Sequence, residues 1–100
     1  MNRINKKTLL LVEDDPLMAM VNTKHLENSG YTVLHAQSGK EAINTVQVNK
    51  ELALILMDID LGDDEYLGTD LAKLILANHN IPLLFFSIIL YLKFRVGRPK

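Results

Sequence analysis

The stretch LALILMDIDLG, residues 52–62, decides the fold of this chain. Its first six residues are apolar, and carboxylates and a glycine follow at once. A short apolar run with such an ending is typical of a buried strand in a parallel sheet, where helices cover both faces. Asp58 would then lie at the carboxyl end of that strand, where ligands bind in open α/β sheets. Taken alone, Asp58 is equally compatible with a solvated residue at a strand end.

The segments on either side of this strand alternate between strand and helix patterns. Asp15 and Pro16 are a cap and a first helical residue, and Ser38 with Glu41 forms a capping box. We expect strands over residues 8–12, 31–36, 52–58 and 83–87, and helices over residues 16–28, 39–48 and 69–78. This order predicts a parallel sheet with right-handed crossovers and helices on both faces.

The composition fits one small globular domain over residues 1–100. The net charge of −1 gives no electrostatic footprint for nucleic acid or for an anionic membrane. The chain has no cysteine, which fits a reducing cytoplasm. The apolar run after the basic N-terminus is too short for a signal peptide, and the longest apolar stretch, residues 83–92, is too short to span a bilayer. We therefore expect a cytoplasmic domain without a membrane segment.

Polar side chains follow three of the predicted strands. An acidic run at residues 13–15 ends the first, Asp58 ends the third, and Ser87 ends the fourth. If the first and third strands are neighbours, about 4.8 Å apart, their carboxylates converge. Two unit charges 4 Å apart repel by roughly 4 kcal/mol at an effective dielectric constant near 20. Such a cluster must either take up a proton or bind a cation.

Oxygen ligands without histidine or cysteine favour Mg²⁺. A carboxylate beside Mg²⁺ can act as a nucleophile toward a phosphoryl donor, which would make Asp58 an aspartyl phosphate. Ser87 would donate its hydroxyl to the phosphoryl oxygens, and a lysine would neutralise the remaining charge.

These motifs resemble the receiver domain of two-component response regulators. The resemblance covers residues 8–87 and rests on LVEDDP at 11–16, ILMDIDL at 55–61, Gly68, and IPLLFFS at 81–87. It implies a flavodoxin-like fold, a three-layer α/β/α arrangement that is incomplete at its C-terminus. Gly68 matches the glycine at the start of the third helix. The loop carries Gly62 where many receivers have a proline two residues after the second aspartate of the motif.

The resemblance also implies the role of each site residue. Asp58 would accept a phosphoryl group from a histidine kinase, with self-catalysed phosphorylation and dephosphorylation as the only enzymatic activity. Asp14 and Asp15 match the acidic pair that holds Mg²⁺ together with Asp58, and the backbone carbonyl of Asp60 matches a further ligand. Ser87 matches the switch hydroxyl.

Residues 88–100 depart from the family pattern. A receiver continues with a helix, a fifth strand that ends in Lys-Pro, and a final helix. Lys93 is the one candidate for the phosphate-facing lysine, but only five residues separate it from Ser87, and a parallel crossover needs about a dozen. If the fourth strand simply continued, Lys93 would lie about 20 Å beyond Ser87. We therefore expect a truncated or frameshifted end that carries basic residues without that role.

Two other functions compete with the phosphorelay receiver. A degenerate receiver fold could act only through contacts, for example as a homodimer through an exposed apolar sheet face or the tail. An aspartate-nucleophile phosphatase is suggested by Asp58-Ile59-Asp60, but Gly62 stands where that pattern has threonine or valine. The expected partner of the leading hypothesis is a histidine kinase, with no nucleic acid and no membrane.

Overall fold

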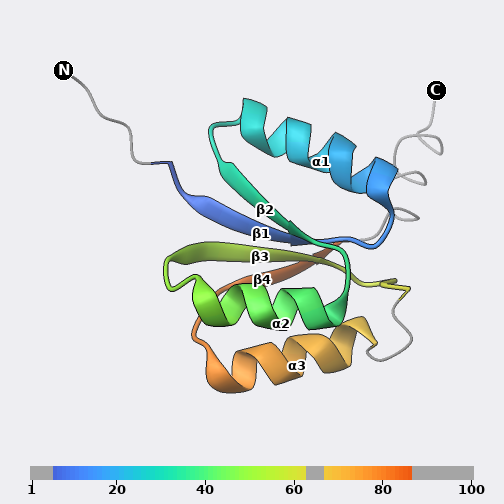
Figure 1. The fold of residues 1–100 in the computed structure, drawn as a ribbon, viewed down its shortest axis with the longest axis vertical. Helices are drawn as coiled ribbons and strands as arrows, with labels where there is room; N and C mark the ends of the chain where they lie inside the picture. The colour runs from blue at the N-terminus through green and yellow to red at the C-terminus, as the bar shows by residue number, and fades with distance from the viewer. Residues whose placement is uncertain (1–5, 63–66, 87–100) are drawn as a thin grey trace, which may run out of the picture.

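A four-stranded parallel sheet forms the centre of the molecule (Figure 1). The computed structural model describes residues 6–62 and 67–86. The strands are β1 (Thr8–Val12), β2 (Thr32–Ala36), β3 (Leu52–Asp58) and β4 (Leu83–Phe86), and the helices are α1 (Pro16–Asn28), α2 (Gly39–Val48) and α3 (Gly68–Asn78). The sheet order β2-β1-β3-β4 is the flavodoxin-like order, so the predicted fold class is confirmed.

The register of the sheet fixes which side chains share a face. Because side chains alternate along a strand, Leu10 and Val12 of β1 lie on the same side as Ile55 and Met57 of β3. All four are buried in one apolar core. The rest of that core comes mainly from α2 and α3, which pack over this side of the sheet: Ala42, Val46, Leu71, Ala72 and Ile75. We call this side the closed face.

Helix α1 covers the opposite side, over β1 and β2 (Figure 1). Leu9 and Leu11 of β1 are buried there. Leu54 and Leu56 of β3, which pair in register with these two leucines, are only half-buried. The two faces of the sheet are therefore covered to different extents.

Local sequence signals set the helix ends. The carboxylate of Asp15 accepts hydrogen bonds from the backbone N–H groups of Leu17 and Met18, and Ser38 accepts one from Glu41 at 3.1 Å. Helix α1 ends at Asn28 and is followed by Ser29, the C-cap, and by Gly30, a glycine with positive φ (99°). The predicted caps of α1 and α2 are thus confirmed.

The first turn of α3 uses close packing instead of a cap. No side chain caps this helix, which begins at Gly68, one residue before the predicted start. A Cβ atom at Gly68 would lie 3.0 Å from the carbonyl oxygen of Ile59 and 3.1 Å from that of Asp58. A side chain at this position would force the helix start and the end of β3 apart by a few tenths of an ångström.

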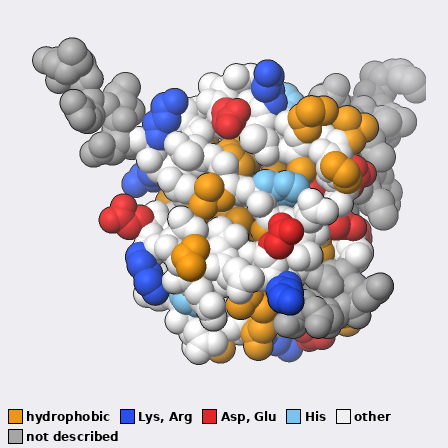
Figure 2. All heavy atoms as spheres, in the orientation of Figure 1, with side chains coloured by type: hydrophobic (Ala, Val, Ile, Leu, Met, Phe, Trp, Pro, Cys, Tyr) orange, Lys and Arg blue, Asp and Glu red, His pale blue; other side chains and the backbone are white. Residues whose placement is uncertain are grey.

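The surface of the described residues mixes both charges. On the face that Figure 2 shows, Lys and Arg side chains alternate with Asp and Glu, and neither sign gathers into one patch. Among the helices of residues 6–62 and 67–86, none has the length and apolar character to cross a bilayer.

Candidate functional site

Three carboxylates meet at the carboxyl edge of the sheet. Each of Glu13, Asp14 and Asp58 offers an oxygen atom, and these oxygens all lie within 4.8 Å of one another. Glu13 is 2% exposed and Asp58 4% exposed, and Asp14 is half-buried. We call these three residues the acidic cluster.

The pairing of β1 with β3 brings the acidic cluster together. Val12 pairs in register with Met57, so the residues that follow, Glu13 and Asp58, leave the sheet at the same edge. The strands are parallel, and every strand in this sheet therefore ends at that edge. The predicted convergence of the acidic run after β1 with Asp58 thus follows from the topology.

The acidic cluster changes the protonation of Glu13. The pKa of its carboxyl group is raised from 4.5 to about 7, chiefly because burial removes solvent from the charged form. A hydrogen bond from the backbone N–H of Asp15 to Glu13 Oε2, at 3.1 Å, acts in the opposite direction. The negative charges of Asp58 and Asp14 raise the pKa further. At neutral pH a proton on Glu13 therefore relieves part of the repulsion.

Asp15 lies outside the acidic cluster, in contrast to the expected pairing of Asp14 with Asp15. Its carboxylate caps α1, with Oδ1 accepting from the N–H of Leu17 at 2.9 Å, and its side chain is exposed. Glu13 lies with Asp14 and Asp58 in the acidic cluster instead. The helix cap is the physical reason, because Asp15 is the N-cap residue of α1 and its carboxylate is engaged by the N–H groups of Leu17 and Met18.

The residues after Asp58 hold its carboxylate in place. The backbone N–H of Asp60 donates to Asp58 Oδ1 at 2.9 Å, which fixes the orientation of that carboxylate. Further along, a Cβ atom at Gly62 would lie 2.6 Å from Asp14 Oδ2. The loop after β3 therefore passes directly against the acidic cluster, and a larger residue at position 62 would displace the carboxylate of Asp14.

His35 is a neighbour of the site that the sequence analysis did not identify. Its Nε2 atom lies 2.7 Å from the backbone carbonyl oxygen of Glu13, so the ring ties the end of β2 to the residue that enters the cluster. The available signal was the position of His35 near the end of the strand beside β1. Ser87, which was expected to contact the phosphoryl group, and Lys93, the disfavoured candidate for the phosphate lysine, lie outside the described residues.

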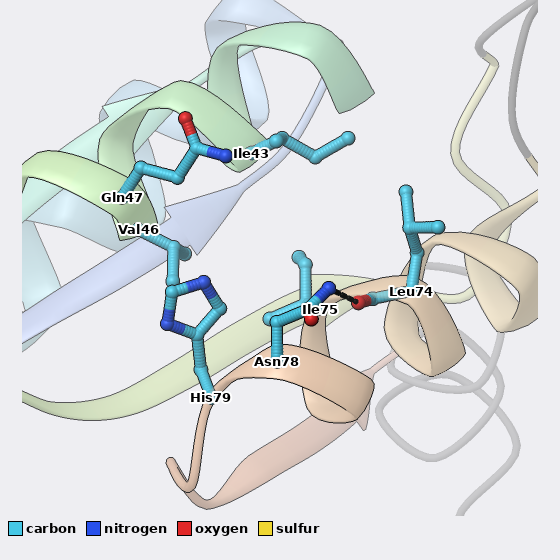
Figure 3. A pocket seen from close by; sticks show the side chains of 7 residues that line it. All are labelled: Ile43, Val46, Gln47, Leu74, Ile75, Asn78 and His79. Atoms are coloured by element: carbon cyan, nitrogen blue, oxygen red, sulfur yellow. Dashed lines mark hydrogen bonds between the residues drawn. The ribbon is translucent and has the colours of Figure 1, made fainter.

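A separate hollow of about 220 Å³ lies between α2 and α3 (Figure 3). Ile43, Val46, Leu74 and Ile75 give it apolar walls, and the amide of Asn78 donates to the carbonyl of Leu74 at 3.4 Å. The C-terminal halves of both helices line it, which places it away from the carboxyl edge of the sheet. No carboxylate lines this hollow, and it takes no part in the site.

The acidic cluster fits a magnesium ion by its donor set. Only carboxylate oxygens converge there, without histidine nitrogen or cysteine sulfur among the clustered side chains. The pKa of Glu13 is raised chiefly by burial, and the negative charges of Asp58 and Asp14 raise it further. A divalent cation would supply a counter-charge to these carboxylates.

Comparisons with known proteins agree with this geometry. The model of the response regulator receiver domain matches residues 9–90. The phyllosphere-induced regulator PhyR of Methylorubrum extorquens is 32% identical over 80 residues, which are 79% of this chain and 30% of PhyR. The sensor protein TorS of Escherichia coli is 32% identical over 71 residues, which are 71% of this chain and 8% of TorS. The chain thus spans less than a third of either relative.

Solved structures show the same fold. The N-terminal domain of a response regulator/sensory box/GGDEF protein from Carboxydothermus hydrogenoformans superposes with a TM-score of 0.75 at 34% identity, covering 81% of this chain and 64% of that one. A receiver protein from Pseudomonas putida has a TM-score of 0.75 at 20% identity, which shows likeness of fold, over 85% of this chain and 70% of that one. With its sheet order, its acidic cluster and a family match over most of its length, the chain belongs to the response regulator receiver domain family.

Proposed function

We propose that this receiver domain accepts a phosphoryl group on Asp58 from a histidine kinase, in a reaction that depends on Mg²⁺. The observation that carries the proposal is a nearly buried carboxylate at a strand end, within reach of two more carboxylates. A structural role alone gives no reason to gather three acids where burial raises the pKa of one of them.

The transfer is a displacement at phosphorus. An oxygen of Asp58 attacks the phosphoryl group of a phosphohistidine, the P–N bond breaks as the P–O bond forms, and the imidazole takes up a proton as it leaves. The hydrogen bond from the Asp60 N–H to Asp58 Oδ1 supports this role, because it holds the carboxylate in one orientation before the donor arrives.

The acidic cluster would hold the metal. Glu13, Asp14 and Asp58 would supply carboxylate oxygens, and the backbone carbonyl of Asp60 is a further proposed ligand. When bound, Mg²⁺ would neutralise charge on the transferring phosphoryl oxygens. The hydroxyl of Ser87 is proposed to hydrogen-bond the phosphoryl group. We expect the site to lack the phosphate lysine of the family, with Lys93 in that role as the alternative.

An open hollow against α1 is a candidate surface for a protein donor, because His35, which contacts the backbone of Glu13, lines it. It has a volume of about 380 Å³ and lies between α1 and the end of β2, lined by Pro16, Met20, Lys24 and His35 among others. A histidine side chain presented by another protein could approach the carboxyl edge next to this hollow. Histidine kinases act on receivers in the cytoplasm, and we propose that location for this domain.

Phosphoryl uptake tests the proposal directly. Incubation with Mg²⁺ and acetyl phosphate should add one phosphoryl mass to the intact protein, and beryllofluoride should shift the amide resonances around residues 58–62. Asp58→Asn should abolish both responses. Asp70→Asn, which removes an exposed carboxylate in α3, is the matched control and should leave both intact. Uptake that persists in Asp58→Asn, or no uptake by the unmodified protein, would refute the assignment.

A second candidate is a module that acts only by contact. Helix α1 leaves Leu17 61% exposed and Met20 62% exposed, an apolar pair that could pack against a second copy. Sedimentation that depends on protein concentration and ignores both Mg²⁺ and beryllofluoride would favour this function. A Leu17→Ser/Met20→Ser variant should then be monomeric, whereas the phosphorelay receiver needs no such dimer.

A further inference from the structure

Part of the sheet on the α1 side has no described element over it. Leu54 and Leu56 of β3 share this side with Leu84 of β4, because Leu56 pairs in register with Leu84. We call these three leucines the open strip. Leu54 and Leu56 are half-buried, and Leu84 is 57% exposed.

The position of α1 explains why the side chains of the open strip are exposed. This helix packs on β1 and β2, where Leu9 and Leu11 are buried, and its main contacts do not include β3 or β4. Strand β4 is also the edge strand, since no strand of the described part of the chain pairs with its outer side. An uncharged edge strand beside an apolar face is a surface that proteins normally cover.

The residues that follow β4 have a matching pattern. From residue 90 to residue 96 the sequence reads LYLKFRV, so that apolar residues alternate with Tyr91, Lys93 and Arg95. Alternation of apolar residues with charged ones, as at positions 92–96, is typical of an extended segment with one apolar face. The family match ends at residue 90, so most of this pattern lies beyond the part of the chain that the family describes.

The segment is also long enough and begins in the right place. Residues 90–96 would span about 23 Å when extended, whereas the four residues of β4 span about 13 Å. Residue 87 follows directly on Phe86, the last residue of β4, so three residues are available to reverse the chain. A reversal there would lead the apolar alternation back along the open strip.

We propose that residues 90–96 dock on the open strip of their own chain. Leu90, Leu92 and Phe94 pack toward Leu56 and Leu84, and the residues between them face solvent. The occupant is this segment and not a second copy, because it is tethered at the end of the strand that carries the strip, which gives it a high effective concentration. This arrangement turns Lys93 to solvent, so it also predicts that phosphoryl uptake does not need Lys93.

Disulfide trapping in the full chain tests the docking. The chain has no cysteine, so pairs can be introduced without background. Leu84→Cys is combined in turn with cysteine at 91, 92, 93 or 94, and oxidation is followed in dilute protein by intact mass and non-reducing gels. Intramolecular disulfides should form at least fivefold faster from positions 92 and 94 than from 91 and 93. Equal rates at all four positions would overturn the proposal, and so would a disulfide-linked dimer as the main product.

Thiol labelling provides a second measurement that does not require a disulfide. The thiol of Leu84→Cys should react slowly in the otherwise unmodified chain, at a rate independent of protein concentration. Adding Leu92→Glu and Phe94→Glu should speed the reaction at least tenfold, whereas the matched pair Tyr91→Glu and Lys93→Glu should not. Full reactivity before these changes, or protection that appears only at high protein concentration, would contradict docking in cis.

Discussion

Strand β3 serves two regions with opposite chemistry, the closed face and the acidic cluster. Ile55 and Met57 are completely buried among apolar side chains on the closed face. Asp58, the very next residue, is almost as buried but carries a carboxylate among carboxylates. The same change occurs in β1, from Val12 to Glu13.

The difference shows how the fold separates stability from chemistry. Apolar burial on the closed face stabilises the domain, whereas the burial of Glu13 and Asp58 opposes folding because charged groups lose their hydration. The two regions share a backbone, so the rigid strand that the core holds is also the support that positions the site. Substitutions in the two regions should therefore have opposite effects on stability.

The largest expected effect is the loss of a core side chain. Ile55→Ala should lower the free energy of unfolding by about 3 kcal/mol, since it leaves a cavity where the surrounding sheet and helices cannot collapse. Urea denaturation followed by circular dichroism measures this. Val48→Ala, at a side chain that is 77% exposed, is the control and should change stability by less than about 0.5 kcal/mol. Equal effects of the two substitutions would mean that the closed face is not the core.

Removing a carboxyl charge from the acidic cluster should raise the free energy of unfolding, which is the opposite effect. Glu13→Gln should stabilise the metal-free protein at pH 7 by on the order of 2 kcal/mol, because the pKa of Glu13 is about 7 in the folded chain and 4.5 when unfolded. The unfolded chain loses this proton first, so the stability of the unmodified protein should fall as pH rises from 4.5 to 7. Below pH 4.5 the group is protonated in both states, and the two proteins should differ little there. If the difference in stability between Glu13→Gln and the unmodified protein were the same at every pH, titration of Glu13 would not be its cause.

Substitutions of the neighbouring residues Asp14 and Asp15 should distinguish metal binding from helix capping. Asp14→Asn should weaken Mg²⁺ binding at least tenfold, about 1.4 kcal/mol, because it removes a carboxylate from the acidic cluster. Asp15→Asn should leave Mg²⁺ binding nearly unchanged, since asparagine caps a helix about as well as aspartate. Isothermal titration calorimetry in the same buffer measures both. If Mg²⁺ binding were lost in Asp15→Asn alone, Asp15 would be a metal ligand, as the resemblance implied.

The smallest expected effect concerns two glycines near the site. Gly68→Ala should destabilise the domain by about 1 kcal/mol, because the new methyl group meets backbone carbonyl oxygens that cannot move away. Gly62→Ala meets only the side chain of Asp14, which can rotate, so thermal stability should hold while Mg²⁺ binding weakens. Thermal melts with and without Mg²⁺ distinguish the two. The same response from both variants would mean that Asp14 is not displaced.

The sequence was sufficient to predict most of the fold. Periodicity predicted all four strands and three helices, and the capping residues Asp15 and Ser38 lie where they were expected. The alternation of elements required a parallel sheet, and the apolar end of β3 placed Asp58 at the correct edge. These features depend on local patterns, which a sequence displays directly.

The composition of the site was harder to predict because it depends on side-chain direction. Three acidic residues in a row, at 13–15, offer two adjacent pairs, and the resemblance assigned the metal-holding pair to Asp14 and Asp15. The structure corrects this through the cap of α1, which engages Asp15 and leaves Glu13 with Asp14. His35 escaped notice for a similar reason, since its contact is with a backbone carbonyl 22 residues away in the chain.

The close approach of Gly68 to the end of β3 has a mechanical consequence. With no side chain between them, the first turn of α3 rests directly on the carbonyl groups of Asp58 and Ile59. Any chemistry at Asp58 that shifts its main chain must then push the helix as well. A displacement of the main chain at Asp58 would therefore move the first turn of α3, and the C-terminal end of that helix would move with it.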